Sequence, residues 1–412
     1  MNIITGAALL AALTLGYSPL QAQVSGCTDP QANNYDANAT TNNGSCLYNA
    51  LTVNVSASVE LPTALEETSG LAFWNNRLIT QNDNSDSTLY ALNMQSGAIE
   101  AQYPITGATN TDWEEVAADD NYIYVGDVGN NVSGNRTDLH ILRVSKASLL
   151  NGSPVADTIR FSYSDQTNFM PAGENNTDFD CEAFWATADS IYLVTKQWLS
   201  HKTSLYALPK MPGNHVAVNR ATLNVDGLVT GATQYHNGTK HVIALSGYSP
   251  LLQPFVYLLY DYPETQFFAG NKRKVQLNLP FHQVEGISTN NGLTYYLSNE
   301  RFTQPPFVDV KQQLHTLDLS NALGGYLSET SGIAAAELKT GYTIYPNPGE
   351  SYLIISTAKT TKSKQYVLRN EVGNVVLRGI LQTDNTKLDV AGMSKGIYWF
   401  TMDGSTHKIS LR

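Results

Sequence analysis

Five short polar clusters recur along the chain at intervals of roughly 45 to 65 residues, and this recurrence constrains the fold more than any other feature. Each cluster opens a strand pattern, and a second cluster follows about a dozen residues later, at the end of the next strand. The opening clusters are Glu67–Leu71, Asp112–Val116, Asp180–Phe184, Leu228–Ala232 and Gln283–Ile287. The second clusters are Asn82-Asp83, Gly126-Asp127, Thr195-Lys196, Ser246-Gly247 and Asn299-Glu300. Such a period in an all-strand pattern predicts a β-propeller.

The propeller is predicted to span residues 51–320. The first four repeats each offer four strand patterns separated by Asn, Asp, Gly and Ser turn signals, whereas the fifth is one strand short. The segment 51–59 precedes the first repeat and fits that gap, which would close the ring and remove exposed sheet edges. We therefore expect five blades. Six is the alternative, if the insertions at 129–138 or 164–179 contain a degenerate blade.

Charge is distributed unevenly along the 412 residues. Residues 1–342 carry 16 Lys and Arg against 31 Asp and Glu, whereas residues 343–412 carry 9 against 5. An acidic main domain argues against nucleic-acid binding, which needs clustered basic side chains.

The N-terminus reads as an export signal followed by a small module. Residues 1–23 combine an apolar run with a small-residue cleavage site near Ala22, and no later segment has the length of a transmembrane span. In residues 24–50, Cys27 and Cys46 bracket a polar stretch that could not fold on its own apolar surface, so we predict a disulfide between them. Cys181 lies inside a strand pattern and is predicted to be a buried apolar residue rather than a nucleophile.

The module between the two cysteines resembles short cysteine-bracketed modules of secreted Bacteroidota proteins. The resemblance lies in Gly26-Cys27-Thr28-Asp29-Pro30 and Gly44-Ser45-Cys46. Oxygen ligands in this stretch suit calcium, and the candidates are Asp29, Asp36, Asn38 and Asn43. The alternative is a disulfide-linked spacer built on Asx turns.

Residues 343–412 form a second β-rich region after a predicted linker at 321–342. Their motifs are Tyr345-Pro346-Asn347-Pro348, Leu388-Asp389-Val390, Gly396–Phe400 and a basic end at Lys408 and Arg412. This pattern resembles the C-terminal sorting domain of type IX secretion cargo. The resemblance implies a small β-sandwich, contact with the type IX secretion machinery, and a secreted or surface-attached protein.

In a propeller the innermost strand of each blade begins where the second strand ends, because the two are antiparallel. The recurring clusters should therefore surround one mouth of the channel. The residues expected there are Glu115, Glu182, Glu285, Asp83, Asp127, Lys196 and Glu300. Crowded carboxylates need protons, donors or a cation. We predict a calcium or other divalent site from Glu115, Asp127, Glu182 and Glu285. The alternative is that the recurring acids only hydrogen-bond the loops between blades.

Residues that differ from the repeated pattern are better candidates for determining which ligand the protein binds. Ligand contacts are expected from Asp83, Trp113, Lys196, Glu300 and Arg301. An exposed Trp beside carboxylates suits a glycan or a cationic ligand, whereas a Trp in a strand is commonly part of the core.

The segments Asp112–Glu115, Gly126–Asn131 and Asp180–Ala183 resemble uncharacterised secreted bacterial propellers and, more loosely, esterase-like phytases. Asn130 replaces an aspartate of that pattern, and the sequence contains none of the standard catalytic motifs. The sequence therefore predicts a secreted, monomeric binding protein with an unknown extracellular ligand. The alternative is a metal-dependent phosphoesterase or lactonase in which Glu115, Asp127, Glu182, Lys196 and Glu285 carry the chemistry.

Overall fold

The computed structural model describes residues 23–238, 240–328, 342–345, 348–357, 364–371, 373–381, 385–402 and 405–412. The chain divides into two compact units, Met1–Thr330 and Ser331–Arg412. Residues 1–22 of the predicted signal peptide lie outside the described residues, as do residues 329–341 of the predicted linker. The beginning of that linker is helical instead: helix α2 (Ser320–Ser328) buries Ala322 and Leu323 against the last blades.

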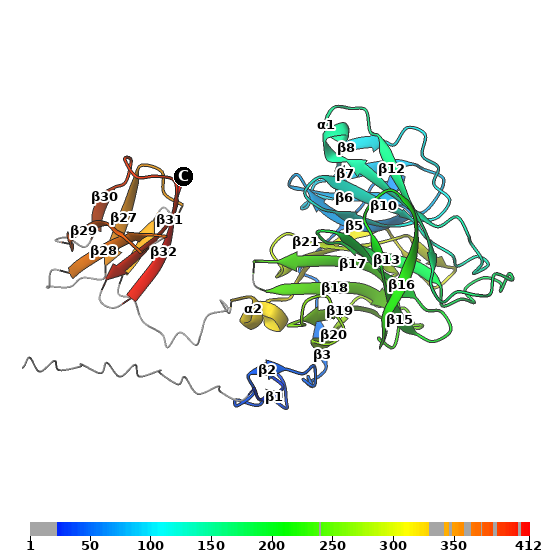
Figure 1. Cartoon of the computed structure of the whole chain (residues 1–412). Helices are drawn as coiled ribbons and strands as arrows, with labels where there is room; N and C mark the ends of the chain where they lie inside the picture. Colours follow the sequence, from blue (N-terminus) through cyan, green and yellow to red (C-terminus); the bar gives the residue numbers. More distant parts are fainter. Residues whose placement is uncertain are drawn as a thin grey trace, which may run out of the picture. The chain divides into compact units, whose positions relative to one another are not determined.

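The described part of the first unit is a five-bladed β-propeller, as the sequence predicts (Figure 1). The strands of each blade are given from the inner strand outwards. Blade 1 contains β5 (Thr68–Trp74), β6 (Arg77–Asn82), β7 (Thr88–Leu92) and β8 (Ile99–Pro104), and blade 2 contains β9 (Trp113–Ala118), β10 (Tyr122–Asp127), β11 (His140–Ser145) and β12 (Ala156–Tyr163). Blade 3 contains β13 (Asp180–Ala186), β14 (Ser190–Lys196), β15 (Lys202–Pro209) and β16 (Gly213–Asn224), blade 4 contains β17 (Leu228–His236), β18 (His241–Tyr248), β19 (Pro254–Tyr260) and β20 (Asn271–Leu277), and blade 5 contains β21 (Val284–Thr289), β22 (Thr294–Asn299) and β25 (Gln313–Asp318). The five inner strands contact one another in order, and β21 lies back against β5, which closes the ring.

The segment predicted to complete the fifth blade is divided between two blades. Strand β4 (Ala57–Glu60) pairs antiparallel with β25 and supplies the missing fourth strand. Strand β3 (Leu51–Val53) instead pairs parallel with β20 and adds an outer fifth strand to blade 4. The N-terminal part of the propeller thus links its last two blades, so no blade keeps an incomplete edge at the closure.

The remaining short elements lie in the connections. A 3₁₀ turn, η1 (Thr63–Leu65), precedes β5, helix α1 (Lys146–Leu150) follows β11, and the hairpin β23 (Phe302–Gln304) and β24 (Val308–Val310) joins β22 to β25. The insertions at 129–138 and 164–179 contain no further strand, so the six-bladed alternative is wrong.

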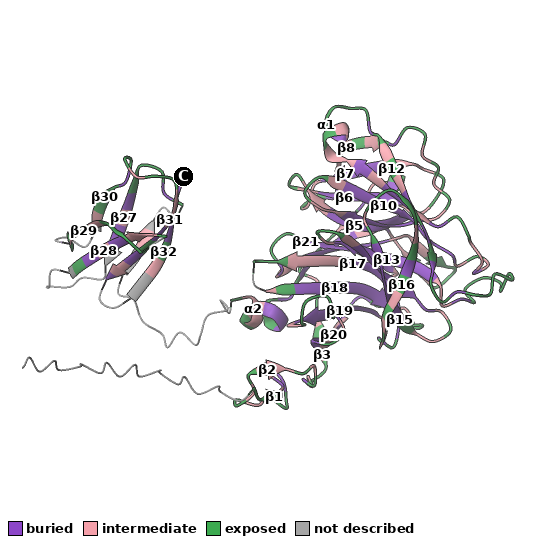
Figure 2. Ribbon diagram, in the orientation of Figure 1, coloured by how far each residue is buried: buried purple, intermediate pink, exposed green. Residues whose placement is uncertain are grey.

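Burial follows the position of each strand in its blade (Figure 2). All residues of β13 are buried, as are six of the seven residues of β14, because both of their faces meet neighbouring blades. The outer strand β8 alternates between half-buried and exposed residues, because one of its faces meets solvent. Apolar clusters fill the space between successive sheets; Trp185 and Phe267, for example, pack edge to face at 5.1 Å between blades 3 and 4.

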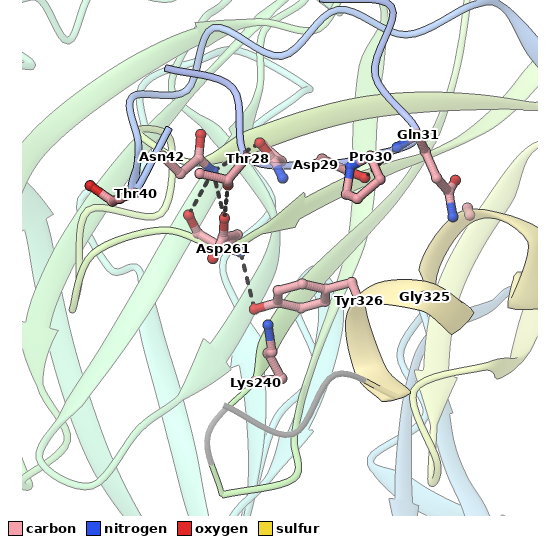
Figure 3. Close-up of a pocket in the computed structure, with 12 residues that line it drawn as sticks. Thr28, Asp29, Pro30, Gln31, Thr40, Asn42, Lys240, Asp261, Gly325 and Tyr326 are labelled. Carbon is pink, nitrogen blue, oxygen red and sulfur yellow. Dashed lines mark hydrogen bonds between the residues drawn. The ribbon is translucent and has the colours of Figure 1, made fainter. Parts of the chain in front are cut away.

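The N-terminal module packs against blade 4 and contains the predicted disulfide between Cys27 and Cys46. Its two short strands are β1 (Ser25–Gly26) and β2 (Thr41–Asn42). The Asn42 amide donates to the carboxylate of Asp261 at 2.9 Å (Figure 3). It also donates to the Asn271 side chain at 2.9 Å. Thr28 donates to the same Asp261 carboxylate at 3.1 Å. A 310 Å³ cleft remains between the module, blade 4 and α2.

The second unit is a small β-sandwich, again as predicted. One sheet contains β26 (Tyr342–Tyr345), β27 (Tyr352–Thr357) and β30 (Asn385–Asp389). The other contains β29 (Val375–Leu381), β28 (Lys364–Asn370), β31 (Gly396–Met402) and β32 (Ser405–Leu411). Leu353 and Leu388 from the first sheet share one core with Leu368 and Phe400 from the second. Residues 346 and 347 of the Tyr-Pro-Asn-Pro motif lie outside the described residues.

Candidate functional site

A β-bulge occurs near the start of each inner strand, and in four of the five blades the bulge residue lines a pocket at the mouth of the channel. At these points the pairing of the inner strand with the second strand shifts by one residue. The extra residue twists the strand and redirects its own side chain. We call the face of the propeller on which the inner strands begin the mouth face. The five bulge residues are Ser69, Glu114, Glu182, Thr230 and Glu285.

A polar pocket of 180 Å³ opens at this mouth. The bulge residues Glu114, Glu182 and Glu285 line it, together with Asp83, Lys196, Tyr248 and Glu300 from the ends of the second strands. Trp198 and the loop residues Glu174 and Asn175 complete its wall. Carboxylates from four different repeats, far apart in the sequence, therefore meet in one small volume, as the repeat pattern predicts.

Blade 2 departs from the predicted arrangement by one residue. The residue that corresponds to Glu182 and Glu285 is Glu114, whereas Glu115 corresponds to Gly70, Ala183, Gly231 and Gly286. The same shift affects the second strand, in which Asp127 pairs with Trp113 and corresponds to Thr195 rather than to Lys196. The prediction placed Glu115 and Asp127 at the mouth, and this placement needs correction.

Glu115 lies deeper, inside the channel, where its neighbours in the other blades are small enough to leave room. Its carboxylate accepts hydrogen bonds from the backbone amides of Val116 at 2.9 Å and Ala232 at 2.7 Å. Complete burial raises the pKa of Glu115 well above its usual range, while backbone amides, including those of Leu71 and Phe184, act in the opposite direction. Glu115 therefore ties the inner strands together and does not reach the pocket.

The Asp127 carboxylate also forms its hydrogen bonds outside the pocket. It accepts a 2.6 Å hydrogen bond from the Arg136 guanidinium and a 3.0 Å bond from the Thr111 amide. Arg136 in turn contacts Asp138 at 3.0 Å and donates to the Gly129 carbonyl. The pair fixes the loop after β10 and does not line the pocket.

Two predicted ligand contacts also lie away from the pocket. Trp113 is fully buried in the core between blades 1 and 2, and its indole N–H donates to the Thr109 carbonyl. Arg301 forms ion pairs with Glu66 at 3.3 Å and Asp309 at 3.6 Å. Asp83, Lys196 and Glu300, by contrast, do line the pocket.

One group of acids in the described residues has the spacing of a metal site. A carboxylate oxygen from each of Asp83, Asp112 and Glu114 lies within 4.8 Å of the other two. The sequence interpretation did not include Asp112 and Glu114 among the candidate metal ligands. The signal was present: aligning Glu115 with the small residues Gly70, Ala183, Gly231 and Gly286 would have matched Glu114 to Glu182.

The pocket holds more negative charge than its own cations balance. Burial and the neighbouring Asp112 raise the pKa of Asp83 to about 8, and burial beside Asp180 raises that of Asp112 to about 6. Burial and nearby acids raise the pKa of Glu285 to about 8 and that of Glu300 to about 7. The pKa of Glu114 is raised well above its usual range by burial and by Glu182. These acids gain protons because they cannot all stay ionised together.

Lys196 neutralises one side of the pocket. Its ammonium lies 3.2 Å from the Glu182 carboxylate, 4.7 Å from the centre of the Trp198 ring and 5.4 Å from that of Tyr248. Burial opposes the charge, but the nearby Glu182 and Glu285 raise the pKa of Lys196 well above its usual range. Lys196 is therefore a cation held inside the protein.

The predicted calcium ligands of the N-terminal module are engaged in hydrogen bonds within the module and, for Asp29, also with blade 4. Asp29 accepts hydrogen bonds from the hydroxyls of Tyr48 and Tyr260, both at 2.7 Å. Asp36 accepts from the Asn38 amide at 2.9 Å, and Asn43 accepts from the Ser45 amide at 3.0 Å. These contacts are those of a spacer built on Asx turns.

Comparison with known proteins identifies the second unit. Residues 343–412 match the family described as the secretion system C-terminal sorting domain. This match supports the prediction that the protein is type IX secretion cargo. The protein is therefore exported to the outer surface or secreted, and its sorting domain implies interaction with the secretion machinery. No described helix is both long enough and apolar enough to span a bilayer.

Solved structures resemble the chain at low identity. PorZ, a surface component of the type IX secretion system of Porphyromonas gingivalis, is 13% identical over 84% of this chain, with a TM-score of 0.28; the match spans 45% of PorZ. A β-fructofuranosidase from Bombyx mori is 10% identical over 88% of this chain and 87% of its own, with a TM-score of 0.38. An exo-β-1,3-galactanase from Phanerochaete chrysosporium is 10% identical over 83% of this chain and 93% of its own, also with a TM-score of 0.38. No curated protein matches this sequence. At these TM-scores none of the similarities bears on the ligand.

Proposed function

We propose that this exported propeller is a binding protein whose mouth pocket holds a divalent cation between Asp83, Asp112 and Glu114. The observation that carries the proposal is the convergence of three carboxylate oxygens within 4.8 Å of one another. Glu114 is 3% exposed, and its Oε1 has no hydrogen-bond partner among the described residues. A buried carboxylate oxygen without a donor is costly, and a cation would supply the missing interaction.

Charge on the two sides of the pocket supports the same site. Lys196 balances the side formed by Glu182 and Glu285. On the other side, the Arg136 guanidinium lies 3.9 Å from Asp112 but is bonded more closely to Asp127 and Asp138. The cationic neighbour of the group Asp83, Asp112 and Glu114 is therefore Arg136, whose shorter ion pairs are made with other acids.

The ligand chemistry favours calcium over transition metals. All three groups are carboxylates, and hard cations such as Ca²⁺ prefer several oxygen ligands at 2.3–2.6 Å. The described ligand set contains neither imidazole nor thiolate, which zinc and copper prefer. Three protein ligands would leave coordination positions open for water or for an oxygen of the bound ligand, such as a glycan hydroxyl.

A metal-dependent hydrolase is the second candidate, favoured by the pKa of Glu300. A carboxyl with a pKa of about 7 on the wall of the same pocket is suited to general-base catalysis at neutral pH. In that case Glu300 would take a proton from a water bound to the cation, and the Lys196 ammonium would stabilise developing negative charge.

Calcium titration of the full mature chain tests the proposal. Calorimetry on the chelator-treated protein should show one bound Ca²⁺, and Glu114→Gln should weaken its affinity by about tenfold or more. Asp226→Asn is the matched control, since Asp226 is an exposed acid on the same face outside the pocket. Failure to bind Ca²⁺, or equal affinity in Glu114→Gln, would contradict the site.

A substrate panel separates the two candidates. Calcium-dependent turnover of a phosphoester or lactone that is lost in Glu300→Gln would favour the hydrolase. Calcium binding without turnover, combined with calcium-dependent signals on a glycan array, would favour the binding protein.

A further inference from the structure

The loops of the mouth face carry large apolar side chains that are exposed to solvent. In the propeller, six such side chains on this face are more than half exposed, from 51% for Phe281 to 90% for Phe307. The loops of the opposite face carry three of this kind, Leu150, Val155 and Met211. The six on the mouth face are Val132, Met170, Leu199, Leu251, Phe281 and Phe307.

Hydrogen bonds hold the backbones of these loops in place. The Asn175 amide donates to the Asn131 carbonyl at 2.7 Å, which joins the loop of Met170 to that of Val132. The Leu199 amide donates to the Asp178 carboxylate at 3.0 Å, and the Phe281 amide donates to the Leu252 carbonyl at 2.9 Å. The apolar side chains thus project from ordered loops, an arrangement that reduces the entropic cost of binding.

The same face is strongly acidic. Its connecting loops, at 61–67, 83–87, 105–112, 128–139, 164–179, 197–201, 225–227, 249–253, 278–283 and 300–312, contain 12 Asp and Glu against 3 Lys and Arg. The loops of the opposite face, at 75–76, 93–98, 119–121, 146–155, 187–189, 210–212, 237–240, 261–270 and 290–293, contain 5 against 3. Acidic loops disfavour anionic lipid and nucleic acid and favour a basic partner.

We propose that the mouth face is a docking surface for a protein segment in which Lys or Arg side chains alternate with apolar ones. The apolar residues of the partner pack on the loop tips, and its basic side chains face the acids around the mouth. Phe and Met are enriched at protein interfaces, and charge complementarity selects the partner and accelerates association. The six exposed apolar side chains lie on loops from blade 2 to blade 5, and the loop within blade 1 on this face, 83–87, is polar.

The acids of the docking surface include the proposed cation ligands Asp83 and Asp112, but its apolar loop tips lie outside the pocket lining. Leu251 and Phe307 lie on loops outside the pocket lining, so the two sites can be altered separately. If the protein binds Ca²⁺ but no peptide, the docking proposal fails and the cation site stands. If it binds a peptide but no Ca²⁺, the cation site fails and the docking surface stands.

Selection from a displayed library of random peptides tests the docking surface. Peptides selected on the full mature chain should be enriched in Lys or Arg next to Leu, Phe or Ile and depleted in Asp and Glu. Binding of the best synthetic peptide should fall by about tenfold or more in the double variant Leu251→Ser/Phe307→Ser, and it should weaken as salt concentration rises. Both side chains are exposed, so the variant should fold normally.

The opposite face supplies the matched control, Leu150→Ser/Met211→Ser, which should bind the peptide as the wild type does. Selection without basic enrichment, or equal binding by the mouth-face variant, would overturn the proposal. Adsorption to phosphatidylcholine vesicles that is lost in Leu251→Ser/Phe307→Ser, without peptide binding, would assign the face to lipid and would also overturn it.

Discussion

The Glu115 carboxylate accepts a 2.7 Å hydrogen bond from the backbone amide of Ala232, across the channel from blade 2 to blade 4. The same side chain caps the amide of Val116 in its own strand at 2.9 Å. A separate 250 Å³ cavity at the far end of the channel is lined by Leu71, Val116 and Ala232, whereas the acidic pocket lies at the mouth. Glu115 therefore joins inner strands in the middle of the channel, between two openings of different chemistry.

Replacing Glu115 should destabilise the propeller far more than replacing the adjacent acid. Glu115→Ala leaves buried backbone amides without an acceptor, which costs about 1–3 kcal/mol for each unsatisfied group. In EDTA, Glu114→Gln removes a buried carboxyl that has an unpartnered oxygen and loses no bound cation, so it should leave stability unchanged or raise it. Urea unfolding followed by tryptophan fluorescence measures both. Equal losses of unfolding free energy in the two variants would show that the hydrogen bonds of Glu115 do not specifically stabilise the inner strands.

The pKa values of the pocket predict that the calcium-free protein loses stability as pH rises. Asp83 and Glu285 have pKa values of about 8 in the folded state, against about 4 when unfolded. The folded state therefore binds more protons than the unfolded state between about pH 4 and pH 8, and the free energy of unfolding falls through this window. In EDTA, Tm should decrease from pH 5 to pH 8.

Calcium should reverse that trend, because protons and the cation compete for the same carboxylates. The increase in Tm on adding calcium should be larger at pH 8 than at pH 5. Asp83→Asn should flatten the pH dependence in EDTA, whereas the control Asp226→Asn should not. A Tm in EDTA that is constant or rises over this range would be incompatible with the raised pKa values.

The close approach of the inner strands requires glycine at position 70. A Cβ there would lie 2.2 Å from the Val116 amide nitrogen and 2.5 Å from the Glu115 carboxylate. Gly70→Ala would push β5 away from β9 and should cost about 3 kcal/mol, at the upper end of overpacking effects. Gly324→Ala in α2 is the control, since its Cβ would meet nothing closer than 4.0 Å. Thermal unfolding of the two variants should differ clearly; equal Tm values would mean that the strands separate at little cost.

Asn42 should hold the N-terminal module on blade 4. Its amide makes hydrogen bonds to Asp261 (Figure 3) and to Asn271. Asn42→Ala should therefore expose residues 23–50 to proteases and speed their hydrogen exchange. Asn43→Ala is the control, because the Asn43 side chain is exposed and bonds only within its own turn to Ser45. Unchanged cleavage in Asn42→Ala would show that other contacts are sufficient.

The repeat pattern was enough to predict the propeller and its mouth, because strand alternation and turn residues are local properties of the sequence. The sorting domain was predicted from the resemblance of the C-terminal motifs to a known family. Matching the carboxylates alone did not assign the register within blade 2, although the small residues at the positions that correspond to Glu115 indicated it. A bulge adds one residue to a strand, and one residue changes the direction of every following side chain. Glu114 and Glu115 are adjacent, so a carboxylate is present in either register. Matching carboxylates alone therefore selected Glu115, which is the wrong residue.

The sequence by itself determined the fold class, the closure of the ring by the N-terminal strand, the disulfide and the route of export, since each depends on residue types at short spacings. Only the tertiary structure decided which acids meet at the mouth, that Glu115 and Asp127 bond elsewhere, and that Asp112 and Glu114 join Asp83. Those assignments depend on the bulges and on how five strands approach one axis. Both are set by packing between blades that lie far apart in the chain.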